Sequence, residues 1–289
     1  MRGWWQDLTE LVLPAECAGC GAPRTVLCPR CRGALGGAVP RRVQPVPEPP
    51  GLPVVHAAAA YALQVRELLL AHKERGALAL TGALGAALAG AVRAGLRPAG
   101  PGGRQAGPGA SGTVLLVPVP SARWAVRARG HDPVRRMALA AAGELRRTGT
   151  PARVVAVLRQ GRAVADQSGL DARRRLENLA GALEVTAGGA RLLTEGRVVL
   201  VDDLITTGAS LAEAARAVRE AAISHSDGGV AVYGAATREG RGERRIGPRE
   251  ESGKWVHGAP ENVAPNAAGE ALHAAVVAGP RDSFEINRN

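Results

Sequence analysis

The sequence predicts an α/β protein in which helices flank a mostly parallel β-sheet, with a small metal-binding element at the N-terminus. Three observations support this prediction. Short apolar runs alternate with helical patterns, one apolar run ends in two carboxylates just before a helix, and four cysteines cluster near the start. Strands that alternate with amphipathic helices are typical of parallel sheets, because a crossover helix is needed to bring the chain back to the same edge.

Length and composition allow one sizeable core with appendages. The chain has 289 residues, of which 46% are hydrophobic and only 2% aromatic, so the core must be built from Val, Leu and Ala. The formal net charge of +11 comes almost entirely from Arg, which is spread along the chain. This charge fits a polyanionic partner such as nucleic acid or a phosphorylated metabolite, but it fits a general bias toward Arg, Ala and Gly equally well.

The sequence gives no sign of a membrane or secreted protein. No run of 18 or more apolar residues is present, and the first ten residues lack the apolar core of a signal peptide. We therefore expect no membrane insertion and a cytoplasmic location.

All four cysteines lie in one short stretch, as two Cys-x-x-Cys pairs. Paired knuckles of this spacing place four thiolates around one tetrahedral ion, which is most often zinc. Two disulfides and a redox-active pair are the alternatives; a cytosolic compartment disfavours the disulfides, and no thioredoxin-like pattern surrounds the pairs. With four thiolate ligands the expected zinc is structural, because no coordination position remains open for catalysis. The expected ligands are Cys17, Cys20, Cys28 and Cys31.

Composition shifts divide the rest of the chain. We assign 1–36 to the zinc-binding element and 37–53, which is dense in Pro and Gly, to a linker. The main domain is expected over 54–238, with a flexible Gly/Pro/Ser-rich loop at 97–113. From 239 to 289 the chain is polar without a sustained period, which predicts a disordered tail.

The elements of the main domain follow from local periodicity and from flanking Gly and Pro. Strands are expected at 54–61, 114–120, 154–158, 198–201 and 229–236. Helices are expected at 64–75, 78–96, 133–147 and after residue 208, and a short helix is possible at 269–277.

The most informative segment is Val198–Ser210, with the sequence Val-Val-Leu-Val-Asp-Asp-Leu-Ile-Thr-Thr-Gly-Ala-Ser. Its apolar run predicts a buried parallel strand that ends in two adjacent acids, followed by a small polar turn into a helix. Ligands of open α/β sheets bind beyond the carboxyl ends of strands, and a helix N-terminus attracts phosphate. The alternative is that the acids only cap the next turn, but one Asp would serve that purpose. The expected contacts to a sugar phosphate are Asp202, Asp203, Thr206, Thr207, Gly208, Ala209 and Ser210.

A second polar loop follows the strand expected at 114–120, at the same edge of the sheet. Its hydroxyl and guanidinium groups suit an anion, although a solvated Arg-rich surface explains any single Arg as well. Lys73 is included among the candidate anion ligands because the chain has only two lysines. His131, beside Asp132, is expected to mark the start of a helix rather than to act as a base. The candidate anion ligands are Ser121, Arg123, Arg127, Arg129 and Lys73.

These motifs together resemble a known family. Residues 199–210 resemble the phosphoribosyl pyrophosphate (PRPP) binding motif of type I phosphoribosyltransferases. The four-cysteine knuckle, the segment 71–76, the loop 117–130 and the segment 167–178 occur in the order typical of the competence-protein-F (ComF) family, over residues 17–237.

The resemblance implies the type I phosphoribosyltransferase fold and a division of labour within the site. Asp202 and Asp203 would meet the ribose hydroxyls, and the turn 206–210 would hold the 5′-phosphate. The loop after Val117 would bind pyrophosphate together with Mg²⁺, and 159–175 would be a flap that closes over the site. The family usually has an aromatic residue, Asn and Gln after Arg129-Gly130; this chain has His131-Asp132-Pro133 instead, so contacts from those side chains are not carried over.

Three functions remain open on this basis. One is transfer of the phosphoribosyl group to an acceptor with release of pyrophosphate. The second is a non-catalytic role in competence, in which the protein serves DNA uptake or processing through protein partners or nucleic acid. The third is a PRPP or nucleotide sensor. No segment of the sequence identifies the acceptor.

Overall fold

The computed structural model describes residues 16–97, 112–162, 172–228 and 272–285. Within these ranges the centre is a six-stranded sheet in the order β1-β2-β8-β7-β3-β4. Every neighbouring pair is parallel except β1–β2, which is antiparallel. The predicted α/β class with a mostly parallel sheet is confirmed.

The sheet strands are β1 Arg41–Val43, β2 Val54–Ala60, β3 Val114–Pro118, β4 Ala152–Val154, β7 Arg197–Leu204 and β8 His273–Gly279. A separate two-stranded antiparallel sheet pairs β5 Leu158–Gln160 with β6 Leu183–Val185. The helices are α2 Pro29–Gly36, α3 Leu63–Glu74, α4 Thr81–Leu96, α5 Arg123–Arg129, α6 Pro133–Arg147, α7 Ala172–Leu179, α8 Gly189–Leu193, α9 Ala209–Gly228 and α10 Asp282–Glu285, with a 3₁₀ turn at Leu78–Leu80.

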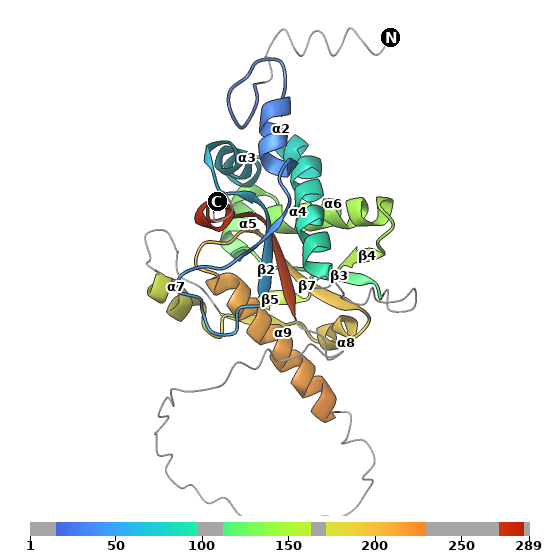
Figure 1. The fold of residues 1–289 in the computed structure, drawn as a ribbon. Helices are drawn as coiled ribbons and strands as arrows, with labels where there is room; N and C mark the ends of the chain where they lie inside the picture. Colours follow the sequence, from blue (N-terminus) through green and yellow to red (C-terminus); the bar gives the residue numbers. More distant parts are fainter. Residues whose placement is uncertain (1–15, 98–111, 163–171, 229–271, 286–289) are drawn as a thin grey trace, which may run out of the picture.

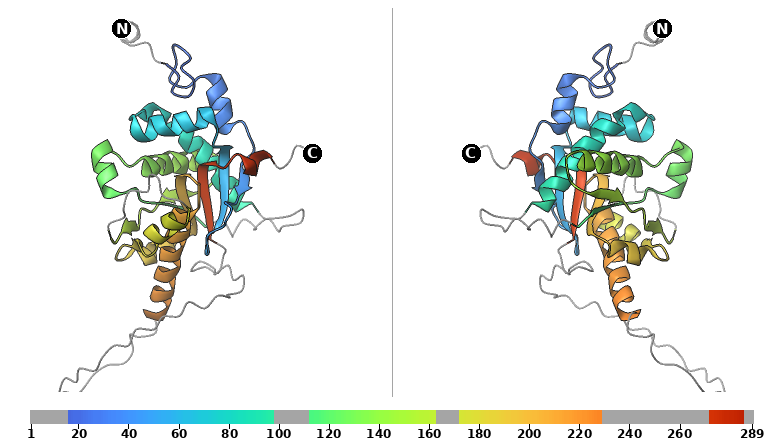
Figure 2. Two further views of the ribbon diagram at one scale, coloured as in Figure 1. Left: turned by 90° about the vertical axis from the view of Figure 1, so that its left-hand side faces the viewer. Right: turned by 90° about the vertical axis from the view of Figure 1, so that its right-hand side faces the viewer.

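Helices cover both faces of the sheet (Figures 1 and 2). Side chains of consecutive strand residues point to opposite faces, so each central strand contributes to two separate cores. In β7, Val199 and Val201 join the core under α4 and α6, whereas Val198 and Leu200 join the core under α9. Burial on both faces explains why β7 has a continuous apolar run rather than an alternating one.

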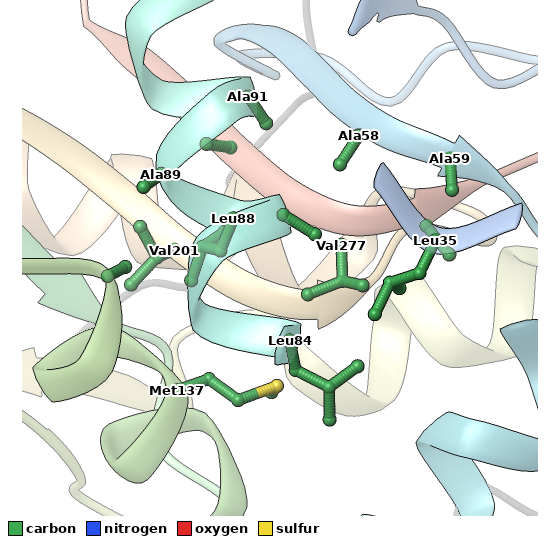
Figure 3. Close-up of a cluster of buried hydrophobic side chains, with 14 of the residues drawn as sticks. Leu35, Ala58, Ala59, Leu84, Leu88, Ala89, Ala91, Met137, Val201 and Val277 are labelled. Atoms are coloured by element: carbon green, nitrogen blue, oxygen red, sulfur yellow. The ribbon is translucent and has the colours of Figure 1, made fainter. Parts of the chain in front are cut away.

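The larger core is centred on α4. Figure 3 shows Leu84 and Leu88 of this helix among Val201 and Val277 of the sheet and Met137 of α6. Small residues allow close approach of the helices: a Cβ placed on Gly85 would lie 2.4 Å from the Cβ of Ala140. Ala and Gly on the helices therefore replace the aromatic bulk that the composition lacks.

One described helix, Leu78–Leu96, is long and apolar enough to cross a membrane by length and composition. Half of its most apolar window is buried inside the protein, and Leu84 and Leu88 are fully buried. Its apolar surface is thus used in the core, as in the central helix of an α/β fold.

The C-terminal segment is the main correction to the sequence prediction. A disordered tail over 239–289 is wrong for residues 272–285, because β8 lies between β2 and β7 in the middle of the sheet. The short helix expected at 269–277 is also wrong. The run Ala274–Ala278 is buried on both faces and pairs in parallel on both sides, which explains its unbroken apolar character. The strand expected at 229–236 lies outside the described residues.

Smaller corrections concern the edges of the domain. The expected linker 37–53 contributes the edge strand β1. In place of the expected strand at 154–158 there are two strands, β4 in the main sheet and β5 in the two-stranded sheet. Helix α6 begins at Pro133 and ends at Arg147 as predicted, with the Asp132 side chain accepting from the N–H of Arg135 at 3.0 Å. The segments 98–111 and 163–171, expected as a loop and as most of a flap, lie outside the described residues.

The placement of β8 gives a direct prediction for stability. Val276→Asp puts a carboxylate at a fully buried position, and we expect a loss of about 4 kcal/mol or more in the free energy of unfolding, or no folding at all. Ile223→Asp, on the exposed side of α9, is the matched control and should change stability by less than about 0.5 kcal/mol. Chemical denaturation of both variants tests this; similar midpoints would contradict a central position for β8.

Candidate functional site

A cavity of about 350 Å³ lies at the carboxyl ends of β3 and β7. Parallel strands bring the loops after their carboxyl ends together at one edge of the sheet, so segments far apart in sequence meet there. Polar and charged residues from four stretches of the chain line the cavity: Lys73, Ser121, Arg129, Gln160, Asp202, Asp203, Thr206 and Ser210.

The two acids are the last buried polar residues of β7, which continues through them to Leu204. Asp203 forms an ion pair with Lys73 of α3, with 2.8 Å between Oδ2 and Nζ. This ion pair raises the pKa of Lys73, so the ammonium stays charged. Asp202 accepts a hydrogen bond from the backbone N–H of Asp203 at 2.8 Å and has no cation of its own among the described residues.

Burial raises the pKa of the Asp202 carboxyl well above its usual range, and the neighbouring Asp203 raises it further. A buried carboxylate next to a like charge is a costly arrangement in a protein without a ligand. Sugar hydroxyls donating to Asp202 would offset that cost, so the position of this acid is better explained by ligand binding than by stability.

The turn after β7 leaves backbone donors free. Within the described part of the chain, the N–H groups of Thr206, Thr207 and Gly208 donate no hydrogen bond, and α9 starts at the next residue. Free N–H groups and the positive end of the helix dipole attract an anion. Thr206 and Ser210 also line the cavity, and their hydroxyls are further donors.

Gly208 is required by this turn. Its φ is +76°, and an added Cβ would lie 3.0 Å from Cδ1 of Leu52 in the segment before β2. We expect Gly208→Ala to cost about 1–2 kcal/mol for the left-handed backbone, plus the cost of displacing Leu52. Gly188→Ala is the matched control, since Gly188 has φ +77° and open space around its Cβ position. Thermal melts should show the larger loss for Gly208→Ala; equal losses would contradict the close contact.

The segment after β3 contacts α3 at the C-terminal end of α5. Arg129 makes a bidentate ion pair with Glu74, with Nη2–Oε1 at 2.6 Å and Nε–Oε2 at 2.8 Å. His131 has its two ring nitrogens 3.0 Å and 3.2 Å from the carbonyl oxygens of Arg129 and His72. Because carbonyls only accept, both contacts are hydrogen bonds when the ring carries both protons. Burial, together with the nearby His131, lowers the pKa of His72 to about 4, so the His72 ring is neutral at pH 7.

The structure brings together most, though not all, of the predicted site residues. Ser121, Arg129 and Lys73 line the same cavity as the two acids. Thr207, Gly208 and Ala209 line a smaller hollow beside it. Arg123 and Arg127 are exposed on α5 and line neither space.

Two residues at the site were missed from the sequence. Trp124 is 59% exposed and lines the cavity, and Gln160 of β5 lines it as well. In a chain with 2% aromatic residues, an isolated Trp in an Arg-rich segment was a usable signal. Nothing in the local sequence marked Gln160, because its position depends on how the chain packs after β4.

The four cysteines form a second candidate site. Their Sγ atoms all lie within 4.8 Å of one another, and all four thiols are free. The Sγ atoms of Cys20 and Cys28 are 3.6 Å apart, much longer than a disulfide bond of about 2.05 Å and close to the roughly 3.8 Å edge of a tetrahedron with 2.3 Å metal–sulfur bonds. Gly19 fits this geometry, since a Cβ there would lie 2.9 Å from Sγ of Cys31.

The electrostatics of the cluster also suit a cation. Burial raises the pKa of the Cys17 thiol, but N–H groups of Cys28 and Gly19 and the neighbouring thiols outweigh it and lower the pKa to about 6. Burial and the thiols of Cys20 and Cys28 raise the pKa of Cys31. Four thiolates at this spacing repel one another unless a metal ion neutralises them, so the cluster is a metal-binding site by position and donor type.

The fold and the cysteine cluster define an α/β protein with a mostly parallel sheet and an N-terminal site for one metal ion. A scan against protein-family models gives no match, and a search of the curated proteins gives no significant one. The function must therefore be argued from the geometry of the site.

Proposed function

We propose that the protein binds PRPP as a type I phosphoribosyltransferase-like member of the ComF family and transfers its phosphoribosyl group to an acceptor. The observation that carries this proposal is the arrangement of Asp202 and Asp203 beside the free N–H groups of residues 206–208. The acids accept hydrogen bonds from vicinal hydroxyls, and the turn holds a phosphate; a phosphorylated pentose offers both groups on one small ring.

Other residues that line the same cavity suit the pyrophosphate. They are Ser121 in the loop after β3, Arg129 at the end of α5 and Lys73 of α3. Displacement at the anomeric carbon builds positive charge on the ribose and negative charge on the departing pyrophosphate. Cations fixed in this loop stabilise the leaving group, while the acids hold the sugar in position for attack.

Magnesium is proposed to enter with PRPP. Among the described residues, the only group of three or more potential metal-ligating side chains is the cysteine cluster, so no protein cage for Mg²⁺ is present near the acids. A Mg²⁺ ion that keeps its waters and binds mainly to phosphate oxygens fits this environment and would neutralise charge on the pyrophosphate.

Zinc is proposed for the cysteine cluster. Four thiolates within reach of one ion favour zinc. Reduced thiols in such a cluster fit a cytoplasmic location. The cluster packs into the main core through Cys31 and Leu35, so the ion would support the fold rather than take part in the reaction.

Pyrophosphate release tests the proposal. The full chain is incubated with PRPP, Mg²⁺ and a panel of purine and pyrimidine bases and ammonia, next to an Asp202→Asn/Asp203→Asn variant and an Asp282→Asn control outside the cavity. We expect release with at least one acceptor, lost in the double variant and retained in the control. A thermal shift by PRPP without release from any acceptor would favour a sensor or a competence adaptor instead. Absence of both would contradict PRPP binding.

A further inference from the structure

A small hollow lies next to the cavity, beside helices α7 and α9, which pack against each other. Its volume is about 40 Å³, and it is lined by the turn 206–208, the first residues of α9, the carboxyl of Asp202 and the side chain of Arg175 from α7. Helix α7 packs against α9, and Arg175 lines the same hollow as the turn with the free N–H groups. The hollow is therefore bordered both by backbone donors and by a residue that carries a guanidinium group.

Arg175 is unusual among the arginines of this region. Its Nε is buried without a hydrogen-bond partner, and no ion pair of Arg175 is found in the described ranges. By contrast, Arg216 pairs with Glu213 and Glu220, and Arg129 pairs with Glu74. The Nε of Arg219 is also unsatisfied, but this guanidinium donates to the carbonyl of Gly51 at 2.7 Å and does not line the hollow.

A buried guanidinium N–H without an acceptor destabilises the protein unless a ligand supplies the acceptor. Apart from the carboxyl of Asp202, the polar groups of the residues around the hollow include three free backbone N–H groups, the hydroxyls of Thr206, Thr207 and Ser210, and the guanidinium, all of which can donate. An anion with several oxygens satisfies such a set, and guanidinium groups match the geometry of phosphate oxygens.

We propose that Arg175 is a ligand-binding residue that clamps a terminal phosphomonoester against the turn 206–210, and that it makes the site selective for a phosphorylated pentose over an unphosphorylated one. This inference rests on the proposed function, because it assigns the 5′-phosphate of PRPP to the hollow. It adds a side chain on α7 to a site otherwise built on the loops after β3 and β7 and on α3.

Binding of two probes separates the two ends of the site. Ribose 5-phosphate carries the phosphomonoester but no pyrophosphate, and Mg²⁺-pyrophosphate is the reverse. For Arg175→Gln we expect about 10- to 100-fold weaker ribose 5-phosphate binding by calorimetry, as for loss of one charge-assisted hydrogen bond. Mg²⁺-pyrophosphate affinity should stay within about twofold of the wild type. Arg175→Lys keeps the charge but lacks the planar guanidinium group, so its affinity for ribose 5-phosphate should lie between those of the wild type and Arg175→Gln.

Arg174→Gln is the matched control, since the neighbouring Arg174 is exposed and does not line the hollow. It should change neither affinity by more than about twofold. Because both probes are measured on the same variant, general destabilisation would weaken both, whereas loss of the clamp weakens only one. Ribose 5-phosphate affinity within twofold of wild type in Arg175→Gln would overturn the role of Arg175 and leave the proposed function intact. Failure of the wild type to bind either probe or PRPP would overturn both.

Discussion

Asp202→Asn is expected to weaken PRPP binding by about 10-fold or more while raising the melting temperature of the protein without ligand. Burial and the adjacent Asp203 make the ionised Asp202 unfavourable in the folded state, and the amide removes that charge at nearly constant volume. The gain should be about 2–4 °C for each kcal/mol relieved. The same change removes a charged acceptor for a ribose hydroxyl, which costs about 10-fold or more in affinity.

The sign of the pH dependence follows from the raised pKa. The folded state favours the protonated Asp202, so wild-type stability is highest where this carboxyl is protonated in both the folded and the unfolded chain. It falls as pH rises through the range between the two pKa values. The difference in stability between Asp202→Asn and the wild type should therefore vanish at strongly acidic pH and grow as pH rises. Melting curves over a pH series measure this difference.

Asp203→Asn provides the contrast, because it should be less stable than the wild type. Its amide leaves the ammonium of Lys73, which is one-third exposed, without its ion-pair partner. Both single variants should bind PRPP more weakly than the wild type, but their stabilities should change in opposite directions. A stabilised Asp202→Asn that still binds PRPP as tightly as the wild type would remove the first acid from the proposed site.

Loss of the metal site is expected to unfold more than the N-terminal element. Cys17, Cys28 and Cys31 belong to the same hydrophobic core as Leu68 of α3 and Leu84 of α4. Without a cation, thiolates this close repel one another, and the free energy of metal binding that supports the fold is lost. We expect Cys31→Ser, or removal of the metal by a chelator, to cost about 3 kcal/mol or more of stability across the main domain.

Metal analysis and unfolding curves test this expectation together. The wild type should contain about one zinc per chain, as a single four-thiolate site requires. Arg30→Ser is the matched control, since Arg30 lies exposed between Cys28 and Cys31 and contributes no ligand. Two disulfides with no metal would contradict the zinc assignment. A Cys31→Ser variant that melts like Arg30→Ser would contradict the coupling between the cluster and the core.

Local patterns in the sequence predicted the elements whose signals are complete within one segment. The helix 133–147, the buried strand leading to Asp202 and the helix after Gly208 are all present, because apolar periodicity and end signals act over a few residues. The four cysteines were predicted as metal ligands from spacing alone, and their thiols do lie within reach of one ion.

Elements that depend on distant partners were not predictable in this way. The run 273–279 was expected as tail or helix, since an isolated apolar stretch after a long polar segment carries no sign of its neighbours. It becomes a central strand because it pairs in parallel with β2 on one side and with β7 on the other. Both of these partners are distant in the sequence. The edge strand β1 depends in the same way on pairing with β2.

The sequence by itself determined the α/β class, the metal-ligand set and the acids and turn of the proposed sugar-phosphate site, because these are encoded by contiguous residues. Only the tertiary structure decided what surrounds them. It paired Lys73 with Asp203 across 130 positions, placed Trp124 and Gln160 at the cavity, and turned Arg175 toward the hollow beside Gly208. Such contacts arise when strands and helices pack at one edge of the sheet, and no local pattern specifies them.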